Sequence, residues 1–198
     1  LEPSKKNTAP AILSVALIKK IPHKQPLLIL PSDHLIEKNK QFNHAIFKNL
    51  KNLNNENIFI FGVKPTFPSK EYGYFLTKKN KNSINRVTQF IEKPSVIRAK
   101  KIIQKRGYWN SGIFFVRKDS IINNFKKYQI RTYKQCFMSI VKSKFKQNIH
   151  RINKSSFNSI TPKSFDYAIL EKTKNINGIM LNIPWTDLGN WKEILKIY

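Results

Sequence analysis

Cysteine, long apolar runs and acidic residues are all scarce in this sequence, and each shortage excludes classes of protein. Only Cys136 is present among 198 residues, so no disulfide can form within the chain, and a reducing, cytoplasmic setting is expected. No run of about 18 apolar residues occurs, and the longest run, residues 11–18, is too short to span a membrane. That run also lacks the basic leader and the cleavage site of a secretory signal, so we expect no membrane partner.

The shortage of acidic residues leaves a strongly basic chain. Asp and Glu number 11 against 37 Lys and Arg, which gives a formal net charge of +26 at pH 7. Such a charge is typical of proteins that bind nucleic acid, but here the lysines are scattered rather than gathered in one block. Abundant Ile, Lys and Asn fit A+T-rich coding instead, so we expect no nucleic-acid partner. Each carboxylate retained in this background is a candidate for a specific role.

The hydrophobic pattern indicates one α/β domain without repeats or linkers. Apolar residues at helical spacing predict helices over 8–20, 36–53, 95–106 and 162–173, one or two within 119–147, and a last one after WTDLGNW (185–191). Buried or alternating runs predict strands at 26–31, 57–63, 74–78, 84–91, 111–117 and 178–183. The strand–helix–strand order from 26 to 63 predicts a parallel βαβ crossover.

Two aspartates follow predicted strands and are candidate metal ligands. Asp33 lies in PSDH, directly after the strand at 26–31, and Asp187 lies in WTDLGNW, after the strand at 178–183. In an open α/β sheet, ligands bind outside the carboxyl ends of the strands, and Mg²⁺ prefers oxygen ligands. Taken singly, each aspartate is equally well explained as a helix cap or an Asx-turn.

Two further motifs place polar side chains near strands. In FIEKP, Glu92 offers a carboxylate to sugar hydroxyls and Lys93 offers a charge to a phosphate, and the two point to opposite faces if the strand continues. In YWNSGIF, Asn110 offers an amide that both donates and accepts, and Gly112 permits close backbone approach. The simpler explanations are a strand end with a surface ion pair and a turn into a core strand.

The motifs taken together resemble one family, the mannose-1-phosphate guanylyltransferases, a branch of the sugar nucleotidyltransferases. The resemblance extends over residues 1–198. It rests on Glu2-Pro3, Asn7-Thr8-Ala9-Pro10-Ala11, Asp33, Tyr72-Gly73-Tyr74, Glu92-Lys93-Pro94, Trp109-Asn110-Ser111-Gly112, Asp166-Tyr167 and Asp187-Leu188-Gly189-Asn190-Trp191.

This resemblance implies a fold and a reaction. The fold is a Rossmann-like α/β nucleotidyltransferase fold with a mixed, mostly parallel sheet. The reaction is transfer from GTP to mannose 1-phosphate, which gives GDP-mannose and pyrophosphate. Such chemistry relies on positioning and charge neutralisation, so a Mg²⁺ ion is expected.

The resemblance also implies the roles of individual residues. Asp33 and Asp187 would hold the Mg²⁺, and Lys93 would contact the sugar phosphate as part of the catalytic group. Three residues would contact mannose: Gly73 through its backbone, and Glu92 and Asn110 through their side chains. Glu2 and Asn7 lie in the family's base-binding turn. One carboxylate at Glu2 can accept from both N1–H and the N2 amine of guanine, a pair of donors that adenine and uracil do not offer.

The chain departs from the family pattern at its start. The family begins with a strand and a glycine-rich loop close to GGxGTRLxPLSR, whereas the six glycines here are all isolated. We therefore expect 1–198 to be a single, partial nucleotidyltransferase domain that lacks the first strand and this loop and has no C-terminal isomerase module. We also expect no turnover by the isolated chain.

Alternative functions stay open at this point. The chain is either part of an active enzyme, with a homodimer or a complementing N-terminal segment as a further partner, or an inactive remnant or sugar-phosphate-binding half-domain. A basic nucleic-acid-binding domain is a minor alternative, because no helix-turn-helix, aromatic RNA-binding strand or zinc spacing supports it.

Overall fold

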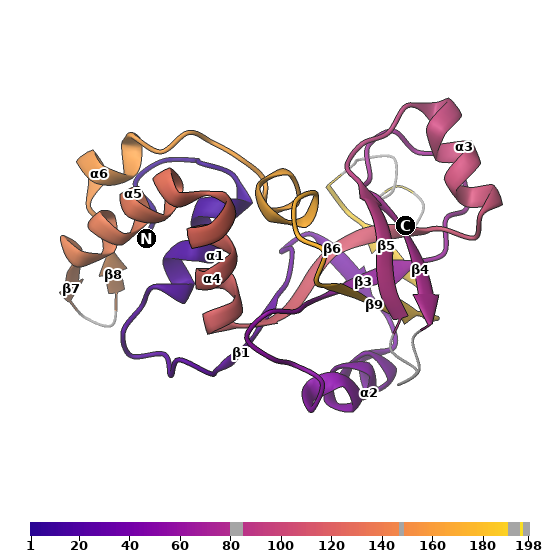
Figure 1. Ribbon diagram of the computed structural model, residues 1–198, viewed down its shortest axis with the longest axis horizontal. Coiled ribbons are helices and arrows are strands. Elements are labelled where there is room, and N and C mark those ends of the chain that lie inside the picture. Colours follow the sequence, from indigo (N-terminus) through magenta and orange to yellow (C-terminus); the bar gives the residue numbers. More distant parts are fainter. Residues whose placement is uncertain (80–84, 147–148, 190–194, 196–198) are drawn as a thin grey trace. The chain divides into compact units, whose positions relative to one another are not determined.

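The computed structural model describes residues 1–79, 85–146, 149–189 and 195 (Figure 1). The chain divides into two compact units, each assembled from separate stretches of sequence. The helical unit is formed by Leu1–Leu27, Asn54–Glu56 and Val116–Lys174, and the sheet unit by Leu28–Leu53, Asn57–Phe115 and Asn175–Tyr198. A division into two compact units does not decide whether the chain folds as one domain or as two. The single domain expected from the sequence therefore stays a prediction.

The helical unit is built on three packed helices, α1 (Thr8–Ala16), α4 (Lys118–Tyr128) and α5 (Ile130–Val141). Its other elements are α6 (Lys154–Asn158), the π-helix η1 (Asp166–Leu170) and the hairpin strands β7 (Lys144–Lys146) and β8 (Ile149–Arg151). In Figure 1, α1 is indigo, α4 and α5 are salmon and α6 is orange. The helix expected at 162–173 is wrong in extent, since only η1 forms there. The helix expected at 8–20 ends at Ala16.

Local chemistry explains where α1 begins. Asn7 is the N-cap, and its side-chain oxygen accepts a hydrogen bond from the Thr8 backbone N–H at 2.7 Å. The Thr8 hydroxyl accepts instead from the backbone N–H of Phe165 at 2.9 Å. The cap therefore lies directly before the helix, and Thr8 anchors a segment distant in the sequence.

A six-stranded sheet forms most of the remaining structure, in the order β1-β6-β3-β9-β5-β4. The strands are β1 (Pro26–Ile29), β3 (Ile58–Val63), β4 (Tyr74–Lys79), β5 (Asn85–Ile91), β6 (Tyr108–Arg117) and β9 (Ile176–Leu181). β3 pairs with β9 in parallel, whereas the β4–β5, β4–β6 and β5–β9 pairs are antiparallel. The predicted mixed α/β architecture is confirmed. β6 lies between β1 and β3, so the two strands of the expected crossover are not neighbours.

The core of the sheet unit lies around β3, of which every residue is buried. Helix α2 (Asn39–Leu50) packs on it through Phe42, whose ring lies 5.4 Å from that of Phe61. Helix α3 (Val96–Gln104) begins after Ser95, which caps it through the Arg98 N–H. The helix predicted after WTDLGNW lies outside the described residues. Among the described residues, no helix is long and apolar enough to cross a membrane.

A second, two-stranded sheet was not expected from the sequence. β2 (His34–Ile36) and β10 (Trp185–Asp187) pair in antiparallel register, and β2 takes up the first residue of the helix predicted from 36. This small sheet belongs to the sheet unit. It joins the two motifs that carry the candidate metal ligands.

Candidate functional site

The pairing of β2 with β10 brings Asp33 and Asp187 together. The register sets Asp187 opposite His34, so Asp33 lies one residue before the paired position. The backbone N–H of Leu188 donates to the Asp33 carbonyl oxygen at 2.7 Å, which extends the pairing past the end of β10. The two aspartates expected to share a metal are therefore held by backbone hydrogen bonds, although they are far apart in the sequence.

The side chains of this pair form a candidate metal site. Asp33, His34 and Asp187 each offer one ligand atom, and these atoms all lie within 4.8 Å of one another. Ligands on opposite sides of a Mg²⁺ ion, each at about 2.1 Å, are about 4.2 Å apart. The Asp33 side chain is 55% exposed and that of Asp187 is 26% exposed, so solvent reaches both carboxylates. Two accessible oxygen donors at this spacing fit Mg²⁺.

Gly189 keeps the space between the carboxylates open. A Cβ at this position would lie 3.0 Å from Asp33 Oδ2 and 3.0 Å from Asp187 Oδ1. The Gly189 N–H also donates to Asp187 Oδ1 at 2.9 Å, which orients that carboxylate. A side chain at this position would therefore occupy the region where an ion between the carboxylates has to fit.

His34 is part of this cluster, although the sequence pattern did not single it out as a site residue. Its Nε2 lies 3.9 Å from an oxygen of each aspartate, and its side chain is only 11% exposed. Burial lowers the pKa of the His34 imidazole, against the opposing effects of Asp187, Asp33 and a hydrogen bond to the Ser111 backbone. The sequence feature that could have indicated His34 as a site residue is its position directly after Asp33 in PSDH.

The residues expected to contact the sugar also lie together. The backbone N–H of Asn110 donates to the Gly73 carbonyl oxygen at 2.8 Å, across the β4–β6 pairing. A Cβ on Gly73 would lie 2.6 Å from Glu92 Oε2 and 3.4 Å from Asn110 Cβ. Gly73 therefore allows the Glu92 carboxylate to lie directly against the backbone, whereas the expected approach of the Gly73 backbone to a sugar stays a prediction.

Gly112 lies between the sugar group and the metal group. Its N–H donates to the Asn110 side-chain oxygen at 3.3 Å. Its φ of +70° lies in the left-handed region that glycine adopts without strain, and a Cβ here would lie 3.4 Å from Pro31 and 3.7 Å from His34. The two groups are thus neighbours within the sheet unit.

Lys93 lies in the turn that follows β5. The strand ends at Ile91, so the strand alternation considered for Glu92 and Lys93 does not extend to them. Lys93 has a φ of +46°, which is uncommon for a residue with a side chain, and its side chain is exposed. The Lys93 side chain is therefore accessible to solvent, and its expected role toward the sugar phosphate stays a prediction.

Aromatic residues line the region beside the metal group. The rings of Tyr72 and Trp109 lie 5.0 Å apart, and Trp185 lies 5.7 Å from Tyr72 and 6.5 Å from Trp109. Trp109 and Trp185 also line a cavity of about 360 Å³ at the carboxyl ends of β3 and β9. Sequence reasoning noted these tryptophans as parts of motifs and assigned them no role.

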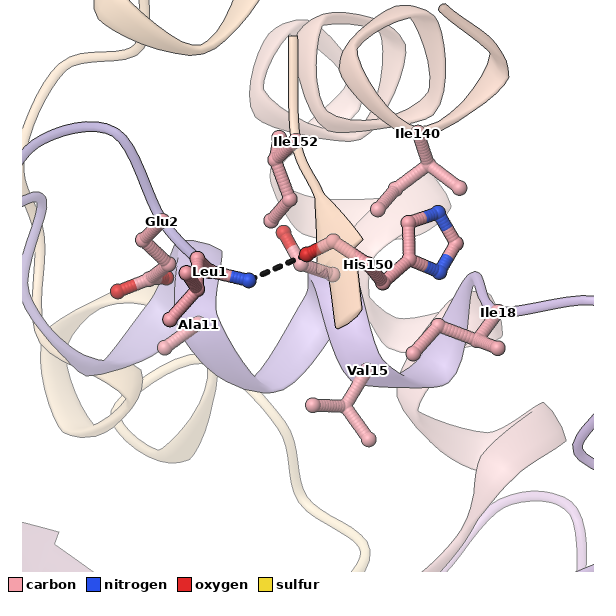
Figure 2. A pocket seen from close by; sticks show the side chains of 9 residues that line it. Leu1, Glu2, Ala11, Val15, Ile18, Ile140, His150 and Ile152 are labelled. Carbon is pink, nitrogen blue, oxygen red and sulfur yellow. Dashed lines mark hydrogen bonds between the residues drawn. The ribbon is translucent and has the colours of Figure 1, made fainter. Parts of the chain in front are cut away.

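Glu2 and Asn7 lie in the helical unit, whereas the other predicted site residues lie in the sheet unit. A mainly apolar hollow of about 230 Å³ lies beside Leu1. Figure 2 shows the Glu2 carboxylate at one end of it and the His150 ring at the other. Burial raises the pKa of the Glu2 carboxyl. The Asn7 side chain is engaged in capping α1, which gives it a structural role.

Comparison with known proteins identifies the family. The family model for nucleotidyl transferases matches residues 1–198, and the chain belongs to this family. The mannose-1-phosphate guanylyltransferase of Escherichia coli is 33% identical over 206 residues, which cover 100% of this chain and 44% of that protein. The chain therefore spans less than half the length of this relative.

Solved structures agree with the assignment to this family. Mannose-1-phosphate geranyltransferase from Thermus thermophilus superposes with a TM-score of 0.85 at 25% identity, over 100% of this chain and 56% of that one. Mannose-6-phosphate isomerase from Helicobacter pylori gives a TM-score of 0.81 at 31% identity, over 94% of this chain and 73% of that one. The resemblance and the fold predicted from the sequence are both confirmed.

Proposed function

We propose that this chain provides the metal-binding and sugar-phosphate-binding residues of a mannose-1-phosphate guanylyltransferase. The enzyme transfers GMP from GTP to mannose 1-phosphate and releases pyrophosphate. The observation that carries the proposal is the grouping, within one unit, of Asp33 and Asp187 beside Gly73, Glu92 and Asn110. The similarity to the E. coli enzyme supports the choice of substrates.

In this proposal, Asp33 and Asp187 hold a Mg²⁺ ion that, when bound, neutralises charge on the phosphates of the reactants. Glu92 accepts hydrogen bonds from sugar hydroxyls, and Gly73 leaves its carboxylate room to lie against the backbone. Lys93 pairs with the phosphate of the sugar, since its ammonium is exposed. The protein's contribution is to hold the attacking phosphate in place relative to the nucleotide.

Glu2 is proposed to select guanine. Its carboxylate accepts from two adjacent donors of that base, which no other common nucleotide base presents in the same arrangement. Because the ionised form is the acceptor and burial raises the pKa, selectivity for GTP should weaken as the pH falls toward the acid range. Glu2→Gln should lose preference for GTP over ATP and UTP in competition binding.

The central test is calorimetric binding of mannose 1-phosphate to the chain in the presence of Mg²⁺. We expect binding to the wild type and to the control Glu56→Gln, an exposed residue of the helical unit. Glu92→Gln should bind at least about tenfold more weakly, because a charged hydrogen-bond acceptor is worth about 1.5 to 3 kcal/mol. Equal or tighter binding of mannose 6-phosphate would contradict the proposal and favour an isomerase substrate.

Turnover is tested by replacing the matching segment of the E. coli relative with this chain. The chimera should form GDP-mannose from GTP and mannose 1-phosphate when Mg²⁺ is present. Asp187→Asn should reduce the rate at least about 100-fold, because even residues behind metal ligands are worth about 10- to 100-fold. A chimera that keeps its rate with both Asp33 and Asp187 changed to Asn would refute the assignment of the metal site.

A further inference from the structure

We propose that His34 is a positioning residue, held in a single tautomer by Trp185, and that it is not a third ligand of the metal. The inference rests on the proposed function, because it concerns the carboxylates assigned there to Mg²⁺. The proximity of the three side chains would by itself favour His34 as a third ligand, since it lies in the same cluster of potential ligand atoms as Asp33 and Asp187.

The hydrogen bond between Trp185 and His34 determines which ring nitrogen carries the proton. Trp185 Nε1 lies 3.2 Å from His34 Nδ1, and an indole N–H donates but never accepts. His34 Nδ1 is therefore the acceptor, and the proton of the neutral ring is on Nε2. The reversed ring orientation would set a C–H against the indole N–H and leave that donor without this partner.

The surroundings hold the two rings in this relation. They meet edge to face, with centroids 5.1 Å apart and an interplanar angle of 89°. Both residues lie in the paired strands β2 and β10, where Trp185 is opposite Ile36 and Asp187 is opposite His34. The His34 side chain is 11% exposed, so rotation of the ring is restricted by packing.

The protonated nitrogen faces the carboxylates. Nε2 is 3.9 Å from Asp33 Oδ1 and 3.9 Å from Asp187 Oδ1. Since Nδ1 accepts from the indole, the Nε2–H is the group that faces the two carboxylates. A nitrogen that carries a proton has no lone pair for a metal, and Mg²⁺ prefers oxygen ligands in any case.

The consequence is that His34 connects the two strands that carry the aspartate motifs. It belongs to β2 and accepts a hydrogen bond from β10 through Trp185. It therefore fixes the two aspartates relative to each other. Ligation of a metal through Nε2 would require the proton to move to Nδ1, which would break the bond to Trp185.

The tautomer is measured by nitrogen-15 NMR of protein labelled at histidine, first without metal and then with saturating Mg²⁺. His34→Gln identifies the His34 signals, and His44→Gln, at an exposed position on α2, is the matched control. We expect Nε2 protonated and Nδ1 unprotonated under both conditions. Loss of the Nε2 proton on addition of Mg²⁺, or an Nδ1-protonated ring without metal, would overturn the inference.

Trp185→Phe provides a second test, because it keeps an aromatic ring and removes only the indole donor. We expect a mixture of His34 tautomers and an affinity for Mg²⁺ that is weaker by about 10- to 100-fold, the usual range for residues behind metal ligands. An unchanged tautomer in this variant would contradict the role given to Trp185. Failure of the wild type to bind Mg²⁺ would count against the proposed function alone, because the tautomer is observed without metal.

Discussion

The helical unit and the sheet unit position their candidate functional residues in different ways. In the sheet unit, strand pairing fixes Asp33 against Asp187 and Gly73 against Asn110. In the helical unit, Glu2 lies on the segment before α1, which is held by backbone hydrogen bonds of Leu1 to His150 and Ile152 and by side-chain bonds from Ser4 and Lys6 to Asn158. Positional accuracy therefore comes from pairing between strands in one unit, and from a mixture of backbone and side-chain hydrogen bonds to a segment without regular structure in the other.

The two units also bury different kinds of group. The sheet unit buries aromatic rings around β3, with polar side chains gathered at strand ends. The helical unit buries Cys136 completely and also most of Lys118, whose ammonium donates to the Ile18 and Ile21 carbonyl oxygens. Burial raises the pKa of the Cys136 thiol to about 12 and lowers the pKa of Lys118. In the sheet unit, burial raises the pKa of the Tyr74 hydroxyl, so each unit has a buried core group through which its stability responds to pH.

The largest expected effect is the loss of a core side chain from the helical unit. Leu13 is fully buried in α1, and Leu13→Ala should lower the free energy of unfolding by about 2 to 5 kcal/mol through lost burial and a cavity. Urea denaturation measures the loss. If the two units differ as described, the sheet unit of this variant should still bind Mg²⁺ at urea concentrations that unfold the helical unit. Loss of Mg²⁺ binding at the same urea concentration as unfolding of the helical unit would contradict a difference between the units.

The next effect concerns the sugar group of the sheet unit. In Gly73→Ala, the new Cβ would lie 2.6 Å from Glu92 Oε2, so the carboxylate must move. Affinity for mannose 1-phosphate should fall about 10- to 100-fold, which is roughly 1.4 to 2.8 kcal/mol at the usual conversion. Isothermal titration measures this fall, and Mg²⁺ affinity serves as the internal control. Undiminished sugar binding would show that Glu92 makes no contact with the ligand.

A third prediction uses the buried thiol. The pKa of Cys136 is raised from 9.0 to about 12, so the unfolded chain releases the thiol proton first as the pH rises above 9. The folded state is therefore destabilised in alkali, by about 1.4 kcal/mol at about pH 10. Denaturation of wild type and Cys136→Ala between about pH 8 and pH 10 should give a steeper decline for the wild type. Parallel declines would indicate a thiol that ionises normally.

The smallest expected effect tests whether Asn7 caps α1 or contacts the base of the nucleotide. Asn7→Ala should lower the free energy of unfolding by about 1 kcal/mol, because the cap of α1 is lost. Its φ of +68° disfavours alanine further, whereas Asn7→Gly should lose only a few tenths of a kcal/mol. Thermal melting compares the two variants. Equal loss of GTP affinity in both, without a matching loss of stability, would mean that Asn7 contacts the base after all.

The sequence was sufficient for those features that depend on local pattern. The run IFIFGV predicted a buried strand because all its residues are apolar or small, and β3 is buried throughout. Asp33 and Asp187 were found because their motifs follow strands. By contrast, β2 and β10 have three residues each, too few for a period to show. The role of His34 depends on that pairing, and so it was missed.

Contacts distant in the sequence explain the failed helix at 162–173. The Lys163 backbone donates to the Lys6 carbonyl oxygen at 3.2 Å and accepts from the Ala9 N–H at 3.1 Å. These bonds hold residues 161–164 out of a helix, so only the π-helix η1 follows. Helical spacing of apolar residues does not reveal a competing partner from another part of the chain.

The position of Gly112 has a consequence for how ligands affect one another. Its missing side chain faces His34 on the metal side, where a Cβ would lie 3.7 Å from the ring, and its N–H donates to Asn110 on the sugar side, so the two groups are separated by a single residue. Occupancy of the two sites should therefore be thermodynamically linked. Whatever factor Mg²⁺ contributes to the affinity for mannose 1-phosphate, mannose 1-phosphate must return the same factor to the affinity for Mg²⁺.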